Sequence, residues 1–525
     1  MTFNEVVPTL NAKGSRYAQR PPPSMHAIAA LALALTATLA GAAAAAPPHL
    51  IFVLADDLGW HSVGFREPSL LTPALDDLRA NGVELNSYYA YKFCSPTRAS
   101  LLTGRWPFKT ESTRNNLIPF SQLDGVNTNF TMLPAKLKAA GYKTHGIGKW
   151  HQGFWQRAFT PEARGFDSFD GFLAGGQDHF TQESFAECGC KARDVWINGS
   201  ATADPSIEGT YNAFRFTRRA TDVIAAHDAA TPLFLYVALQ NTHAPIEADA
   251  SFAALYPRET YATRRNFSAM VSAVDSAVAN ITAALKAAGL WDNSVLWWAS
   301  DNGTPVGVGG SNWPLRGSKG SNWEGGVRLP ALVGGGALPA AAAGRNLSGL
   351  VHAADVYATF CALAGVPPAD GEWAPVDGVD AWPYISGANA TAPRTRIVHE
   401  HRLFEGPPST GALRDGDWKL IVNKEEAADW YGDKSDGHFT PPRSGTQNLT
   451  KAACSAAVPC LFNISADPEE RADLAAARPD VVAQLLAVFR SYDAAHHPPA
   501  ASPAKDAAAC CAASAAAGNV LAPWG

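Results

Sequence analysis

Cys94 opens the stretch C-S-P-T-R at residues 94–98, which places a sulfur nucleophile four residues before the guanidinium of Arg98. Pro96 and the apolar residues after it are typical of the first turn of a helix, and Gly104 is a typical helix end. Cys94 would then lie at a helix N-terminus, where free N–H groups and the helix dipole favour an anion. Arg98 would lie one turn along the same face. The spacing indicates an anion site, although an isolated cysteine is more often a small buried apolar residue.

Oxygen ligands for a metal ion come from two pairs of neighbouring residues. Asp56 and Asp57 form one pair, and Asp301 and Asn302 form the other. Carboxylate and amide oxygens are hard ligands that suit Ca²⁺ or Mg²⁺ better than Zn²⁺. The sequence has no Cys/His cluster with the spacing of a zinc site. These residues therefore predict a divalent-cation site built from oxygen ligands.

Two further segments carry basic or proton-transferring side chains. Lys149 and His151 alternate, so both would point the same way in an extended segment. His243 follows a predicted strand, where a histidine can act as a general acid or base. A lone histidine is more often part of the core or the surface, and its position beyond a strand end is what favours a functional role.

Three apolar runs of strand length precede most of these polar residues. They are His49–Ala55, Leu233–Leu239 and Val295–Ala299, as expected for strands buried on both faces. Helical patterns over Met132–Ala140 and Phe267–Leu285 alternate with them. We therefore predict an α/β fold with a mostly parallel central sheet flanked by helices. Ligands of such sheets gather beyond the carboxyl ends of the strands, where the polar residues follow.

The composition changes along the chain. Residues 47–393 carry the strands and motifs and form the predicted large domain. Short strands such as Ile397–Glu400 and a helix over Pro479–Tyr492 predict a smaller C-terminal α+β domain at residues 394–495. Residues 496–525 form an Ala/Pro-rich tail.

Residues 1–46 are typical of a secretory signal peptide. Lys13, Arg16 and Arg20 precede an apolar run that ends in small residues. Met25 opens this run directly and is an alternative start of the chain. The run is also long enough for an uncleaved membrane anchor. The signal peptide predicts a secreted protein or one of a lysosome-like compartment.

Other features of the sequence agree with export. Sequons for N-glycosylation start at Asn129, Asn198, Asn266, Asn280, Asn302, Asn346, Asn389, Asn448 and Asn463. Eight cysteines predict a few disulfides, of which Cys454 and Cys460 could form a local one. Cys510 and Cys511 lie in the Ala-rich tail and have no predicted structural role. The net charge of -6 gives no sign of a basic surface that would bind nucleic acid, so nucleic acid is not an expected partner.

The motif C-x-P-x-R followed by A-S-L-L-T-G-R resembles the signature of the sulfatase family. Further segments are similar to that family in the right order, namely residues 53–59, 148–151, His243, 300–303 and 315–319. The similarity runs from about Pro48 to Leu474. Around residues 270–290 and His151 the chain most resembles arylsulfatase B and its relatives. The resemblance implies an alkaline-phosphatase-like large domain and a sulfuric ester hydrolase of the arylsulfatase type.

The resemblance also implies a modified residue and a metal ion. Cys94 would be oxidised by a formylglycine-generating enzyme to formylglycine (3-oxoalanine), which hydrates to a geminal diol. The diol would attack the sulfur of an aryl sulfate or a sulfated carbohydrate. Alcohol and inorganic sulfate would then leave by way of a sulfated formylglycine intermediate. One Ca²⁺ ion is implied, with ligands from Asp56, Asp57, the modified Cys94, Asp301 and Asn302.

Individual catalytic roles follow from the same resemblance. Arg98 would orient the formylglycine, and Lys149 would hold a sulfate oxygen or contact the diol. His151 would deprotonate the diol in the step that expels sulfate. His243 and Lys319 would stabilise or protonate the departing alkoxide or phenoxide.

Two alternatives stay open from the sequence. One is a phosphodiesterase or phosphonate monoester hydrolase with the same fold, which often uses Ser or Thr as nucleophile and two metal ions. The other is a non-catalytic binder of sulfated glycans, against which the presence of every catalytic residue argues. Residues 152–163 and 304–323 are expected to shape the pocket, and their loops, rather than the motifs, would select the natural substrate. The sequence leaves the oligomeric state open.

Overall fold

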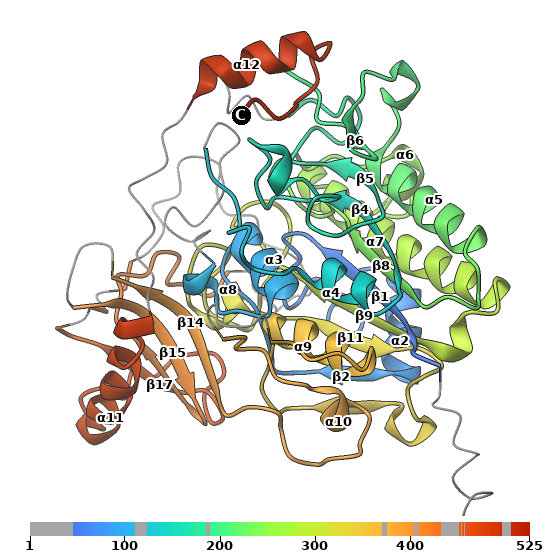
Figure 1. Ribbon diagram of the computed structural model, residues 1–525. Coiled ribbons are helices and arrows are strands. Elements are labelled where there is room, and N and C mark those ends of the chain that lie inside the picture. Colours follow the sequence, from blue (N-terminus) through green and yellow to red (C-terminus); the bar gives the residue numbers. More distant parts are fainter. Residues whose placement is uncertain are drawn as a thin grey trace, which may run out of the picture. The chain divides into compact units, whose positions relative to one another are not determined.

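A ten-stranded sheet lies at the centre of the unit Pro47–Gly525 in the computed structural model (Figure 1). The residues that the structure describes are 46–110, 123–184, 189–369, 375–403, 408–431, 451–452, 454–455, 457–495 and 506–525. Apart from its last residue, the predicted signal peptide lies outside the described residues, as do Cys188 and the sequon asparagine Asn448.

The strands of the central sheet run in the order β12-β2-β11-β9-β1-β8-β4-β5-β6-β7. Their bounds are β1 His49–Ala55, β2 Val83–Leu85, β4 Lys143–Lys149, β5 Ser168–Phe172, β6 Trp196–Ile197, β7 Ser200–Ala201, β8 Leu233–Ala238, β9 Ser294–Ser300, β11 Ala331–Gly334 and β12 Arg345–Leu347. The parallel strands β9, β1, β8, β4 and β5 form the middle of this sheet.

The side chains of β1 show why this sheet is buried on both faces. Leu50, Phe52 and Leu54 belong to one hydrophobic core, whereas Ile51 and Val53 belong to another. Successive side chains of a strand point to opposite faces of its sheet. A strand with apolar residues at every position therefore needs a layer of helices on each side.

Two layers of helices supply these cores (Figure 1). One face is covered by α3 (Cys94–Thr103), α4 (Leu133–Ala139) and α9 (Ala353–Leu363), and the other by α2 (Pro73–Asn81), α5 (Asn212–Ala225) and α7 (Ala262–Ala287). Among the described residues, α7 alone is long and apolar enough to cross a membrane, but its most apolar window is 67% buried inside the protein. Its apolar composition is explained by the core that it covers.

The predicted fold class is confirmed. The expected strands β1, β8 and β9 are neighbours and pair in parallel. Strand β4 was not predicted, because lysine, histidine and two glycines interrupt its apolar pattern. It nevertheless pairs with β8 and β5 in the middle of the sheet. Strand β11 runs antiparallel to β9, so the sheet is mixed at that side.

A separate antiparallel sheet follows in the C-terminal part of the chain. It contains β14 (Arg396–Arg402), β15 (Thr410–Asp415), β16 (Trp418–Ile421) and β17 (Cys460–Asn463) in this order. Helix α11 (Pro479–Arg490) packs against its apolar face. These elements are the α+β part expected from the sequence, and a domain boundary between residues 393 and 394 stays a prediction.

Smaller elements connect these layers. A three-stranded sheet consists of β10 (Arg328–Leu329), β3 (Tyr88–Tyr89) and β13 (Val351–His352). The remaining α-helices of the described residues are α6 (Ala250–Ala253), α8 (Glu324–Val327), α10 (Trp382–Ile385) and α12 (Ala507–Ala516).

Two disulfides join described cysteines. Cys454 pairs with Cys460, as the sequence suggested. Cys511 of α12 pairs with Cys190, which lies 321 residues earlier in the chain. The expectation that the cysteines of the Ala-rich tail have no structural role was therefore wrong for Cys511. A partner so distant in sequence leaves no local pattern from which the pairing could be predicted.

Candidate active site

The carboxyl ends of neighbouring parallel strands bring the predicted site residues together. Asp56 directly follows β1, Lys149 is the last residue of β4, and Asp301 directly follows β9. His243 lies in the loop that follows β8. Because β9, β1, β8 and β4 are adjacent in the sheet, these four side chains meet at one edge.

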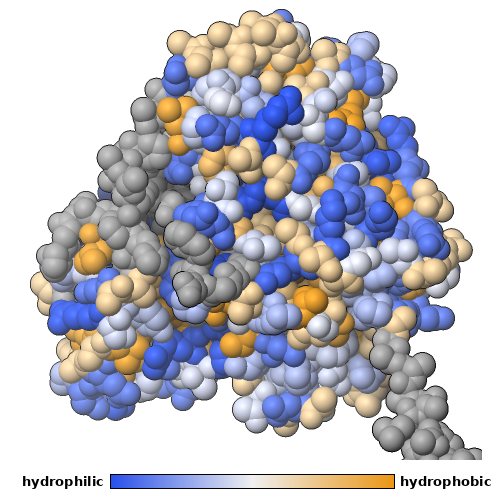
Figure 2. Space-filling model, viewed as in Figure 1, coloured by the Kyte–Doolittle hydropathy of each residue, from blue (hydrophilic) through white to orange (hydrophobic). Residues whose placement is uncertain are grey.

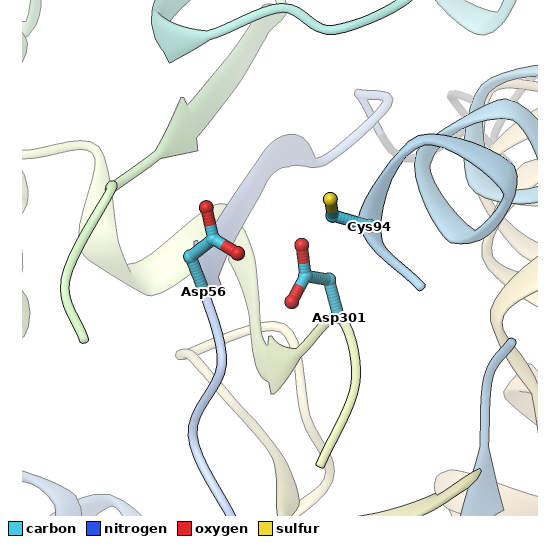
Figure 3. Close-up of side chains that lie close together, drawn as sticks. All are labelled: Asp56, Cys94 and Asp301. Carbon is cyan, nitrogen blue, oxygen red and sulfur yellow. The ribbon is translucent and has the colours of Figure 1, made fainter. Parts of the chain in front are cut away.

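Cys94 lies at the N-terminus of α3, whose residues are all buried. The helix ends at Gly104, which adopts the left-handed conformation that glycine tolerates best, with φ of 70°. The Sγ atom of Cys94 is 3.4 Å from Nδ1 of His151. Figure 3 shows the Cys94 side chain directed toward Asp56 and Asp301, and possible ligand atoms of these three residues lie within 4.8 Å of one another. Burial raises the pKa of the thiol, although Lys149 and Lys319 oppose this shift.

Each buried carboxylate of the site has a cationic partner from another element. Lys149 Nζ lies 2.6 Å from Asp56 Oδ2, and Lys319 Nζ lies 2.6 Å from Asp57 Oδ1. Burial raises the pKa of Asp301, and the charge of Asp56 raises it further. Burial would also raise the pKa of Asp57, but Lys319 and His243 hold it below its usual value.

Arg98 is fully buried beneath the nucleophile. Its guanidinium donates to Asp301 Oδ2 over 2.8 Å and to the carbonyl of Lys149 over 3.3 Å. The carboxylate of Asp301 and the negative charges around it keep the pKa of Arg98 above its normal value despite burial. Arg98 therefore connects helix α3 to the ends of β4 and β9.

Two buried oxygen atoms indicate where a cation would bind. Oδ1 of Asp56 and Oδ1 of Asn302 have no hydrogen-bond partner. An acceptor buried without a donor is unfavourable, and a hard cation satisfies such an oxygen. Together with Asp57 and Asp301, these residues form an oxygen-rich set that suits Ca²⁺ or Mg²⁺. The donor set therefore fits the metal ion that the sequence predicted.

His151 occupies an unusual backbone conformation. Its φ is 55°, so the segment is not extended beyond Lys149, contrary to the alternation inferred from the sequence. Its backbone N–H donates to the carbonyl of Leu173 over 3.0 Å. Burial, and then the charge of Lys149, place the pKa of the imidazole well below its usual value. Both effects favour the neutral imidazole.

His243 and Lys319 both contact Asp57 and therefore lie on the same side of the site. Nε2 of His243 is 3.9 Å from Asp57 Oδ2, and its Nδ1 lies 2.8 Å from the carbonyl oxygen of Ala244. Burial and the charge of Lys319 lower the pKa of His243 well below the usual value. Lys319 stays protonated, because the attraction of Asp57 outweighs the effect of burial and raises its pKa.

Glu400 of β14 supports the site from the second sheet, and the sequence patterns did not identify it. Its carboxylate accepts from Lys92 Nζ over 2.7 Å, from Asn322 Nδ2 over 2.6 Å and from the hydroxyl of Tyr91 over 2.8 Å. Lys92 lies two residues before Cys94, and Asn322 lies three residues after Lys319. The signal in the sequence was a charged residue, Glu400, within a strand that has a buried face. The residues that Glu400 contacts are distant in sequence, so the pattern could not identify them.

The fold and these side chains define the class of protein. A buried cysteine at a helix N-terminus, oxygen-rich side chains and basic side chains lie together at the carboxyl edge of an α/β sheet, an arrangement typical of hydrolases that act on anionic esters.

Comparison with known proteins is more specific. The sulfatase family profile matches residues 48–366. Arylsulfatase J of Mus musculus is 37% identical over 463 residues, which cover 85% of this chain and 76% of that relative. Arylsulfatase A of Homo sapiens is 31% identical over 477 residues, covering 86% and 89%. The crystal structure of Ps i-CgsB in complex with k-i-k-neocarrahexaose has a TM-score of 0.70 at 27% identity, covering 87% of this chain and 94% of that one. The chain belongs to the sulfatase family and is a sulfuric ester hydrolase.

Replacing Glu400 tests the support that the second sheet gives to the site. Glu400→Gln would leave the buried ammonium of Lys92 without its counter-charge. We expect the free energy of unfolding to fall by about 3 kcal/mol in denaturant titrations. Glu426→Gln is the matched control, because Glu426 and its partner Lys451 are 60% and 69% exposed. The control should change stability by less than about 0.5 kcal/mol, and equal losses in both variants would contradict the argument.

Proposed function

We propose that residue 94 is oxidised to formylglycine and that the modified residue is the nucleophile of sulfate ester hydrolysis. The position of Cys94 supports this proposal, since its side chain begins α3, lies 3.4 Å from His151 Nδ1 and faces Asp56 and Asp301. The hydrated aldehyde supplies two hydroxyls on one carbon, one to attack sulfur and one whose deprotonation restores the aldehyde. A plain serine or cysteine offers a single nucleophilic group and would need water to attack the sulfate ester.

His151 is the base in this proposal. Its Nδ1 lies 3.4 Å from Cys94 Sγ, within reach of a proton on the side chain at position 94, and burial and Lys149 favour the neutral ring that a base requires. Lys149 is fully buried and carries its charge next to Asp56, within reach of the same space. Such fixed charges stabilise a developing anion more than mobile water does.

His243 and Lys319 act on the leaving group in this proposal. Both contact Asp57, which keeps their nitrogen atoms on one side of the site. Lys319 is protonated and can donate to the departing alkoxide or phenoxide. His243 keeps Nδ1 against the Ala244 carbonyl, so its Nε2 would first take up a proton and then deliver it to the leaving group. A departing oxygen that receives a proton is a much better leaving group.

We also propose that Asp56, Asp57, Asp301 and Asn302, together with the modified residue 94, hold one Ca²⁺ ion. A bound divalent cation would neutralise sulfate oxygens and lower the pKa of a hydroxyl beside it. The uncompensated oxygens of Asp56 and Asn302 support this assignment. Asn302 also begins a sequon, but its side chain is fully buried, as expected for a ligand rather than a glycan carrier.

The proposed route to the active enzyme passes through the secretory pathway, where a formylglycine-generating enzyme would modify Cys94. Several sequon asparagines are exposed, namely Asn129, Asn198, Asn280, Asn346 and Asn389. The two disulfides between described cysteines agree with an oxidising compartment. For the substrate we propose an aryl sulfate or a sulfated carbohydrate.

A comparison of two substrates separates this proposal from a phosphoester hydrolase of the same fold. Among the described residues two possible ligand groups share Asp56, so substrate preference, rather than the ligand set, separates the two classes of hydrolase. We expect kcat/KM for an aryl sulfate to exceed that for the matching aryl phosphate by about 100-fold or more. A preference for the phosphate would overturn the proposed reaction.

Mass spectrometry of the peptide that contains residue 94 tests the nucleophile. Active enzyme should carry formylglycine at this position, and Cys94→Ala should lower kcat by about 1,000-fold or more. Cys361→Ala is the control, because Cys361 is the other described cysteine outside a disulfide and lies in the core of α9. It should retain activity. An unmodified thiol in active enzyme would exclude the formylglycine route.

Removal of Ca²⁺ tests the metal site. Chelation should lower both activity and the thermal midpoint, because buried carboxylates that repel one another lose their counter-charge. Restored Ca²⁺ at 100 times its Kd should stabilise the protein by about 2.7 kcal/mol. Asp301→Asn should abolish this stabilisation, whereas Asp222→Asn on the exposed side of α5 should keep it. A thermal midpoint that Ca²⁺ leaves unchanged in the unaltered protein would contradict the assignment.

A further inference from the structure

The C-terminal segment 506–525 contacts two other parts of the chain. One lies next to Asp194, and the other follows His151. Helix α12 lies at the top of Figure 1, and its outer surface in Figure 2 is largely apolar, as expected from its alanines. The disulfide from Cys511 to Cys190 fastens this helix. Val520 and Leu521, which follow the helix, are buried, with 0% and 1% of their surface exposed, whereas Gly518, Asn519 and Gly525 are exposed.

The first contact is with the segment that precedes Asp194. Arg193 donates its backbone N–H to Asn519 over 2.9 Å and accepts from Leu521 over 2.8 Å, as in a short parallel bridge. Asp194, the next residue, is fully buried. Its two carboxylate oxygens accept from the backbone N–H groups of Leu173 over 2.9 Å and of Ala174 over 2.8 Å.

Leu173 and the residues after it pack directly against His151. The carbonyl of Leu173 accepts the N–H of His151. A Cβ atom at Gly175 would lie only 2.7 Å from Cε1 of the imidazole, so the ring packs directly on the glycine backbone. Asp194 therefore controls the turn that supports both the main chain and the ring of His151.

The second contact is with the segment that follows His151. The last two residues, Trp524 and Gly525, donate their N–H groups to the carbonyl of Trp155 over 2.9 and 2.8 Å. The rings of Trp524 and Phe154 pack edge to face with centroids 5.4 Å apart. Gln152, in the same segment, donates to the carbonyl of Ser95 beside the nucleophile over 3.1 Å.

We propose that Asp194 and the C-terminal segment are positioning elements of the active site that together hold His151 against Cys94. A non-glycine residue with a positive φ occupies a sparsely populated conformation and persists only where its surroundings fix it. Here the surroundings are two segments, 173–175 and 152–155. The C-terminal segment is bonded directly to Trp155 of the second and reaches the first through Arg193, the residue before Asp194. The inference rests on the proposed role of His151 as the base.

The test compares two buried carboxylates with the same function in the fold. Asp194→Asn leaves an amide with a single acceptor oxygen, so one of the two backbone bonds is lost. Asp275→Asn is the matched control, because Asp275 is 5% exposed and also accepts two backbone N–H groups, from Ala74 and Leu75, away from the site. A third variant ends the chain before Trp524 and leaves the disulfide in place.

Hydrogen exchange and kinetics together give the outcome. In Asp194→Asn, exchange of the peptide covering 171–178 should accelerate, and in the shortened chain, exchange of the peptide covering 150–159 should accelerate. In both variants kcat for an aryl sulfate should fall about tenfold or more with KM within about twofold. Asp275→Asn should change neither. Unchanged exchange at these peptides, or unchanged kcat where exchange is faster, would overturn the proposal. If the unaltered protein leaves aryl sulfates intact, the proposed function fails, while the exchange data still report whether the terminus holds the His151 segments.

Discussion

The concentration of negative charge at one edge of the sheet is the constraint on which the site depends. Asp56, Asp57 and Asp301 place three carboxylates in a space with almost no solvent, where like charges repel strongly. The fold places a cation beside each of these carboxylates. The cations are Lys149, Lys319 and Arg98, which come from a strand, a loop and a helix. Because each cation is fixed by its own element, the layers of the fold and the chemistry of the site are mutually dependent.

The parts of the fold that the sequence predicts are those with a local signature. Strands β1, β8 and β9 each contain a continuous apolar run, and the polar residues after them had to meet once the strands were parallel. Strand β4 has no such signature, since its neighbours in the sheet, rather than its own composition, place it there. The backbone turn at His151 and the roles of Glu400 and Asp194 depend on partners far along the chain. Sequence patterns report residue types and their spacing, whereas these contacts join residues that are far apart in the sequence at no regular spacing.

The second sheet contributes a buried ionic network rather than a catalytic group. Lys419 on β16 lies 2.9 Å from carboxylates of both Glu324 and Glu470. Burial alone would raise the pKa of Glu400, but Lys92 and Arg402 lower it to about 2. The stabilisation from this ionised group is therefore complete above the unfolded pKa of about 4.5 and is lost as the pH falls toward 2. The carboxylate of Glu400 therefore stays ionised under mildly acidic conditions, whereas burial raises the pKa of Glu470 to about 7.

Asn302 has a consequence for biosynthesis. Its sequon is exposed to oligosaccharide transfer only while the chain is still unfolded, since the folded side chain is fully buried. A glycan attached at that moment would be too large for the buried space beside Asp57 and would prevent formation of the proposed cation site. In a host that exports and glycosylates the chain, the yield of competent enzyme would then depend on whether β9 pairs with β1 before a glycan is attached to Asn302.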